Sequence, residues 1–170
     1  MHFCTITQES DFHERSYKMA EYLMGIDAGT GSVRVALFDF RGQNRAYAVA
    51  EYGTTYPKNG WAEQSDYEWF EALKKAIPEC IKKAGIAADN IAAITCDATT
   101  NTLVYLDEND TSVRPPILWM DVRATEEASF IDTIREEYDA TKFYKPGFRA
   151  DTMVPKCMWV KKNEPENWAK

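Results

Sequence analysis

The chain has 170 residues, of which 45% are hydrophobic and 13% aromatic, enough apolar surface for one domain with a core rather than a disordered segment. Its formal net charge is −7 and it has no long basic run, which argues against a nucleic-acid partner. No apolar run approaches the roughly 20 residues of a membrane span, and no secretory signal is present, so we expect a cytoplasmic protein without membrane contact.

The first 18 residues are polar, mixed in charge and without hydrophobic period. We expect residues 1–18 to be a disordered extension and Met19 to be the true start. Both histidines of the chain lie in this extension, so acid–base chemistry elsewhere would fall to carboxylates, lysines or tyrosines. The four cysteines show no C-x-x-C spacing, which is typical of reduced thiols.

Residues 22–40, YLMGIDAGTGSVRVALFDF, predict a β-strand, a tight glycine turn and a second strand. Gly29 and Gly31 fall in the turn, where a backbone either takes a positive φ or comes close to a ligand. The first strand ends at a carboxylate, and two hydroxyl residues accompany the glycines. These polar residues are Asp27, Thr30 and Ser32.

This combination suits a magnesium–polyphosphate site, because backbone N–H groups and hydroxyls hold phosphate oxygens while a carboxylate holds the metal or its waters. The spacing D-x-G-T-G-S-x-R does not fit the dinucleotide fingerprint, which needs G-x-G-x-x-G opening a helix. It does not fit a P-loop either, which needs G-K-[ST]. The alternative is an ordinary hairpin with a glycine turn.

Residues 46–52 predict a third strand, and three strands in succession favour an antiparallel start to the sheet. Ser65 and Glu68 form a capping box that opens a helix, and Gly85 suits its C-terminal cap. The apolar residues of this helix recur at helical spacing, which predicts its inner face. They are Trp69, Leu73, Ile77, Ile81 and Ala84.

Residues 91–96 predict a short buried strand that is parallel to the first. The polar stretch 97–102 follows it, at the strand end where open α/β sheets bind ligands. Further along the chain we expect a strand over 103–106, an amphipathic helix over 124–138, and a helical segment over 154–168 that Pro155 and Pro165 break.

Four motifs then agree in order. D-x-G-T-G-S-x-R at 27–34, GWAEQ at 60–64, ILWMDVRA at 117–124 and PKCMWVKKNEPENW at 155–168 resemble the FGGY family of carbohydrate kinases. The resemblance covers residues 22–170. It implies an α/β fold of the ribonuclease H-like type, shared by the actin, hexokinase and heat-shock ATPase superfamily, in which a mixed sheet opens with an antiparallel β-hairpin.

The resemblance implies phosphoryl transfer from magnesium-ATP to a sugar hydroxyl, which depends mainly on positioning and charge neutralisation. Asp27 would act through magnesium and its waters, and Arg34 would neutralise charge. Alternatively, Arg34 is a surface arginine on the second strand. The residues that would line the phosphates are Gly29, Thr30, Gly31 and Ser32.

Within the family, DATTNTLVYLD at 97–107 is most similar to the ribulokinase branch, whereas xylulose and glycerol kinases usually carry Gln-Met-His or Arg-Glu there. Thr100 and Asn101 would then contact the sugar. The implied substrate is a ketopentose such as ribulose or xylulose, or a related polyol, rather than glycerol. The alternative is that these side chains only stabilise a turn.

Trp119, Asp121 and Arg123 would form part of the sugar pocket, with the indole as an apolar wall and the charged pair orienting hydroxyls. The alternative is a structural Asp–Arg pair that closes the turn before the next helix.

Family members are much longer than this chain and have two similar domains around a cleft. Residues 19–170 would be the N-terminal part of the first domain. The aspartate that deprotonates the sugar lies in the missing half, so we expect no catalytic residue here and an inactive fragment. A homodimer is one option for the full-length protein. Two alternatives stay open: a non-catalytic nucleotide- or sugar-binding remnant, and another ATPase of the superfamily.

Overall fold

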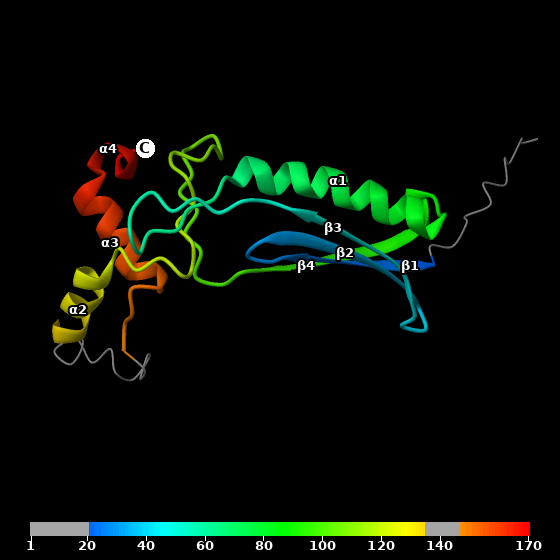
Figure 1. The fold of residues 1–170 in the computed structure, drawn as a ribbon, viewed down its shortest axis with the longest axis horizontal. Coiled ribbons are helices and arrows are strands. Elements are labelled where there is room, and N and C mark those ends of the chain that lie inside the picture. The colour runs from blue at the N-terminus through cyan, green and yellow to red at the C-terminus, as the bar shows by residue number, and fades with distance from the viewer. Residues whose placement is uncertain (1–20, 135–146) are drawn as a thin grey trace, which may run out of the picture.

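The computed structural model describes residues 21–134 and 147–170, so the predictions for residues 1–18 and for Met19 lie outside the described part. A four-stranded sheet with one long helix forms one end of the molecule, and three short helices form the other end, as Figure 1 shows. Loops join the two ends. Within the described ranges, every helix is too short or too polar to cross a membrane.

The sheet begins with the predicted hairpin. Strand β1 (Tyr22–Ala28) pairs antiparallel with β2 (Ser32–Asp39), and β2 pairs antiparallel with β3 (Asn44–Glu51). Strand β4 (Ile91–Ala98) returns parallel to β1 and gives the order β3-β2-β1-β4. The prediction of a mixed sheet that opens with an antiparallel hairpin is confirmed.

Helix α1 (Asp66–Ala84) connects β3 to the short 3₁₀ helix η1 (Ala88–Asn90), which leads into β4. The Ser65 hydroxyl accepts a hydrogen bond from the Glu68 amide at 3.4 Å, which satisfies one of the free donors of the first turn. Gly85 ends the helix with a φ of 67°, a conformation that glycine takes without steric cost. Both predicted ends of the helix are therefore confirmed.

The core lies between α1 and one face of β2 and β3. Val33, Val35 and Leu37 alternate along β2, and they meet small alanines of β3. From α1 the buried residues are Ala72, Ala76 and Cys80, while the predicted residues Leu73, Ile77, Ile81 and Ala84 are partly buried beside them. The helix thus faces the sheet through small side chains, which allow the two backbones to approach closely.

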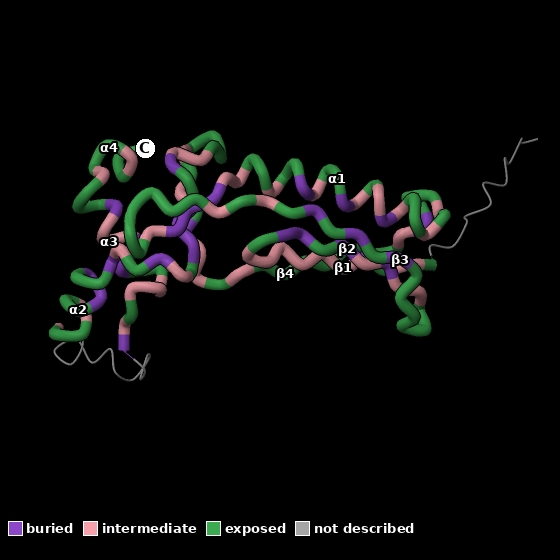
Figure 2. Tube along the Cα trace, viewed as in Figure 1, coloured by how far each residue is buried: buried purple, intermediate pink, exposed green. Residues whose placement is uncertain are grey.

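Strand β4 is exposed along most of its length, so the prediction that it is buried is wrong. By contrast, β2 has buried residues along much of its length, drawn in purple in Figure 2. The physical reason is its position at the edge of the sheet, since β4 pairs only with β1 among the described strands and α1 packs over β2 and β3.

Residues 103–106 form isolated bridges rather than the predicted strand. Leu103 exchanges two hydrogen bonds with Ile117, of 2.8 and 2.9 Å, and Leu106 bridges Ser112. Between these bridges stand Pro115 and Pro116, which have no N–H to donate and therefore cannot continue a ladder. Ile117 also bridges Glu63, so the loops lie side by side without forming a sheet.

The other end of the molecule carries α2 (Thr125–Ile134), α3 (Met153–Asn163) and α4 (Pro165–Trp168). The predicted continuation of α2 to residue 138 lies outside the described residues. Pro155 does not break its helix, because it falls in the first turn of α3, where a missing N–H is tolerated. Pro165 does separate two helices, since it is the first residue of α4.

Two matched leucine substitutions test this core. Leu37 of β2 is fully buried, whereas Leu23 of β1 is 39% exposed. We expect Leu37→Ala to lower the free energy of unfolding by about 3 kcal/mol, because it leaves a cavity under α1. Leu23→Ala should cost about 1 kcal/mol or less. Urea unfolding of both variants checks this, and equal losses would contradict the assignment of the core face.

Candidate active site

Three successive carbonyl groups of the turn between β1 and β2 accept hydrogen bonds from residues outside the turn. The Gly29 carbonyl accepts a hydrogen bond from the Tyr52 hydroxyl, and the Thr30 carbonyl accepts one from the Gln64 side chain at 2.6 Å. The Gly31 carbonyl accepts one from the Tyr52 amide at 3.2 Å. Burial raises the pKa of Tyr52, with a smaller contribution from the Asp27 carboxylate, so its hydroxyl stays a donor. The turn is therefore held in one conformation.

Neither backbone conformation nor packing explains the glycine at position 31. Its φ is outside the left-handed region, and a methyl group added there would meet no atom within 4 Å. At Gly29, by contrast, a methyl group would lie 3.1 Å from a guanidinium nitrogen of Arg34. Open space over a glycine backbone fits a ligand that approaches the chain closely. A phosphate group is such a ligand.

Asp27 lies at the end of β1, opposite Arg34 of β2 and beside Asp97 of β4. The Arg34 guanidinium donates to one carboxylate oxygen of Asp27 at 2.7 Å, and the Asp27 side chain is 47% exposed. This hydrogen bond, together with the charge of the carboxylate, raises the pKa of Arg34. An accessible carboxylate beside a cation and an open glycine backbone fits magnesium and phosphate together.

Trp119 is the predicted sugar-side residue that reaches the hairpin. Its indole N–H donates to the Thr30 hydroxyl at 3.0 Å, and the side chain is 41% exposed. Residue 119 is 89 positions away from residue 30 in the chain. The fold thus brings the predicted phosphate turn and the predicted apolar wall of the sugar pocket into direct contact.

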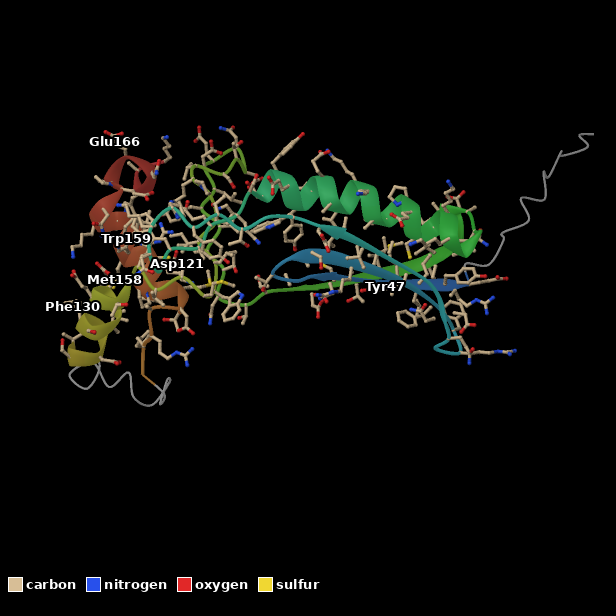
Figure 3. The ribbon with its side chains drawn as sticks, in the orientation of Figure 1. Tyr47, Asp121, Phe130, Met158, Trp159 and Glu166 are labelled. Carbon is tan, nitrogen blue, oxygen red and sulfur yellow. The ribbon has the colours of Figure 1, made fainter. Side chains whose placement is uncertain are left out.

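Asp121 and Arg123 have buried side chains, unlike the exposed Trp119. Their side chains have no exposed surface, and the Arg123 guanidinium donates to both oxygens of the Asp121 carboxylate, at 2.9 and 2.8 Å. The same carboxylate accepts a hydrogen bond from the Ala62 amide at 2.6 Å. Figure 3 shows Asp121 among the loops beside α3. This geometry favours the alternative of a structural pair, and a sugar contact through these two residues stays a prediction.

The Asp121–Arg123 pair belongs to a larger buried ionic network that the sequence analysis missed. Glu63 accepts from Arg123 at 2.8 Å and from Arg114 at 2.7 Å, and Arg114 also donates to Glu164 at 2.8 Å. The guanidinium of Arg123 stacks over the Trp61 ring at 3.8 Å. These contacts join the 60–64 and 117–124 motifs to the end of α3.

Thr100 and Asn101 lie in the turn that follows β4. Asn101 has a φ of 59°, the left-handed conformation that asparagine tolerates. The Thr99 amide bonds to the Ala28 carbonyl at 3.2 Å, and the hydroxyls of Thr99 and Thr102 lie 3.0 Å apart. The turn after β4 therefore starts beside the end of β1, close to the glycine turn. The Thr99–Thr102 contact lies within the turn after β4.

A buried lysine holds this turn to the Trp119 loop, and the sequence analysis missed it. Lys156 has no exposed surface, and its ammonium donates to the carbonyls of Asn101, Leu118 and Asp151 at 2.7, 2.8 and 3.0 Å. A lysine in the otherwise apolar run 153–160 was the available signal. Desolvation lowers the pKa of Lys156 to about 8, against favourable charges from Asp121 and Asp151.

Replacing this lysine tests its energetic role. We expect Lys156→Met to lower the free energy of unfolding by about 3 kcal/mol at pH 7, because three buried carbonyls lose a donor. The folded pKa of Lys156, about 8, is below its ordinary value of 10.5. The unfolded chain therefore binds more protons between these values, and the parent gains stability there as pH rises.

The deficit of Lys156→Met relative to the parent should consequently widen between pH 8 and pH 10. Urea unfolding at both pH values measures it, with Lys161→Met on the exposed side of α3 as the matched control. A deficit that shrinks as pH rises would contradict the lowered pKa.

Residues 22–170 match the N-terminal domain of the FGGY family of carbohydrate kinases. A xylulose kinase of Staphylococcus epidermidis is 34% identical over 149 residues, covering 87% of this chain and 29% of that protein. A glycerol kinase of Oleidesulfovibrio alaskensis is 31% identical over 156 residues, covering 89% of this chain and 31% of that protein.

Solved structures agree with the sequence relatives. The crystal structure of a "xyloylose kinase" from Brucella ovis matches with a TM-score of 0.77 and 28% identity, over 87% of this chain and 30% of that one. The ligand-bound xylulose kinase from Lactobacillus acidophilus matches with a TM-score of 0.75 and 25% identity, over 88% and 30%. The chain spans about 30% of the length of these relatives. It belongs to the FGGY family of carbohydrate kinases, as part of their N-terminal domain.

Proposed function

We propose that the protein to which this chain belongs transfers the terminal phosphoryl group of magnesium-ATP to a hydroxyl group of a sugar or related polyol. The observation that carries the proposal is the contact between the Trp119 indole and the Thr30 hydroxyl. It joins an open glycine turn, suited to phosphate, to an exposed aromatic wall, suited to the apolar face of a sugar. Phosphoryl transfer requires these two ligands at one place.

Magnesium-ATP supplies the phosphoryl group, and the chain supplies the means to bind and orient it. The Asp27 carboxylate would hold the metal or its waters. The backbone and hydroxyls of Gly29, Thr30, Gly31 and Ser32 would line the phosphates. Arg34 would neutralise phosphate charge, which requires it to exchange its bond to Asp27 for one to the nucleotide. We assign no catalytic residue in this chain.

The sugar side rests on Trp119 together with Thr100 and Asn101. Relatives named as xylulose kinases favour a ketopentose, and those named as glycerol kinases keep a smaller polyol open. The DATTN stretch favours ribulose or xylulose over glycerol, as the similarity to ribulokinases implies. A homodimer of the full-length protein also stays a prediction.

A sugar panel tests the proposed function. The gene is first sequenced past the codon for Lys170, and the full-length product is assayed for ADP release with ribulose, xylulose and glycerol. We expect turnover with a ketopentose and weaker turnover with glycerol. Magnesium-ATP binding without turnover on any sugar would favour a non-catalytic remnant, and hydrolysis indifferent to sugar would favour another ATPase of the superfamily.

Two glycine substitutions separate ligand binding from folding. A methyl group at Gly31 or at Gly53 would meet no atom within 4 Å, so both alanine variants should keep the parent's unfolding midpoint. Only Gly31→Ala should weaken magnesium-ATP binding, by about tenfold or more, because phosphates approach that backbone. Calorimetric titration measures it. Equal affinities for the two variants would contradict phosphate binding at the turn.

Substitutions of Trp119 test the sugar wall. Trp119→Phe keeps an aromatic face and loses only the N–H bond to Thr30, whereas Trp119→Ala loses both. We expect the KM for the sugar to rise a few-fold in Trp119→Phe and about tenfold or more in Trp119→Ala, with the KM for ATP little changed. A larger change in the KM for ATP than for the sugar would place Trp119 on the nucleotide side.

A further inference from the structure

Lys156 is a buried cation that the proposed chemistry does not use. Side chains of lysine are rarely fully buried, and a buried ammonium is costly unless its hydrogen bonds are satisfied. Here all three donors of the ammonium have an acceptor, and every acceptor is a backbone carbonyl. A buried lysine that bonds only to backbone fixes the positions of the segments it touches.

The three carbonyls come from three separate segments of the chain. Asn101 belongs to the turn after β4, Leu118 immediately precedes Trp119, and Asp151 precedes α3. The first two segments carry the candidate sugar contacts. Each has little regular pairing of its own, since Leu103 and Ile117 make only an isolated bridge. The Lys156 ammonium therefore joins the two segments that carry the candidate sugar contacts, beside the Leu103–Ile117 bridge.

We propose that Lys156 is a positioning residue, which sets the Thr100–Asn101 turn and the Trp119 loop at the spacing that the sugar requires. This inference rests on the proposed function and deepens it, since it assigns sugar affinity to a residue that does not touch the sugar. The Leu118 carbonyl bond holds the loop so that the next residue, Trp119, donates to Thr30.

The chemistry of the side chain explains why lysine is required. An ammonium directs three hydrogens from one atom toward the corners of a tetrahedron, so it can join three carbonyls that converge. A guanidinium directs its donors outward in one plane and needs more room, and arginine is therefore a poor substitute at this point.

Hydrogen exchange tests the positioning directly, without need of activity. Amide exchange is compared in the parent, Lys156→Met, Lys156→Arg and the control Lys161→Met. We expect Lys156→Met and Lys156→Arg to speed exchange at residues 99–103 and 117–120 by about tenfold or more beyond the increase that the lower global stability gives to β1 and β2. Lys161→Met should match the parent. Unchanged exchange at both segments, or an increase there no larger than in β1 and β2, would overturn the inference.

Steady-state kinetics of the full-length protein provide the second readout. A positioning role predicts that Lys156→Met raises the KM for the sugar by about tenfold or more while the KM for ATP stays within about twofold. Lys156→Arg should not restore the parent's KM for the sugar. If Lys156 only stabilised the fold, its replacement would lower kcat, because less protein would be active, and would leave both KM values unchanged. That result would overturn the inference.

The two proposals fail separately. A parent protein that phosphorylates no sugar would remove the proposed function, and the exchange pattern would still decide whether Lys156 holds the two segments. An active parent whose sugar KM is insensitive to Lys156→Met would keep the function and remove the positioning role.

Discussion

Buried charge holds the loops of this protein together. Glu63, Arg114, Asp121 and Arg123 form one ionic network with little or no exposure to solvent, and the Lys156 ammonium lies close by with three carbonyl partners. Charges that leave water must find partners in fixed geometry, because an unpaired buried charge costs several kcal/mol. The described loops between β4 and α2 have only isolated bridges, so this requirement sets their relative positions.

The sheet and the loops contribute different parts of the candidate site. The hairpin of β1 and β2 presents an open glycine turn whose carbonyls are held from behind by Tyr52 and Gln64. The loop at Trp119 meets that turn through one hydrogen bond to Thr30. A rigid turn suits a polyphosphate, which gains most from donors that are already in place. An aromatic wall beside it suits the less polar face of a sugar.

Local patterns predicted local structure well. The hairpin follows from two apolar runs around glycines, and α1 follows from its Ser65 cap and Gly85 end. Features set by distant contacts were not predictable in this way. The exposure of β4 depends on its place at the sheet edge, and the Asp121–Arg123 pair is buried because Glu63 and the Ala62 amide meet it from another loop. Lys156 gave only a weak signal, since a single lysine in an apolar run does not reveal whether its ammonium is buried.

A crystal structure of the full-length protein with magnesium, a non-hydrolysable ATP analogue and a ketopentose tests the central claim most directly. We predict that the phosphates contact the backbone of residues 29–32, that Asp27 faces the metal, and that the sugar lies against the Trp119 indole. A nucleotide bound away from the glycine turn, or a sugar bound away from Trp119, would contradict the claim that this contact forms the active site.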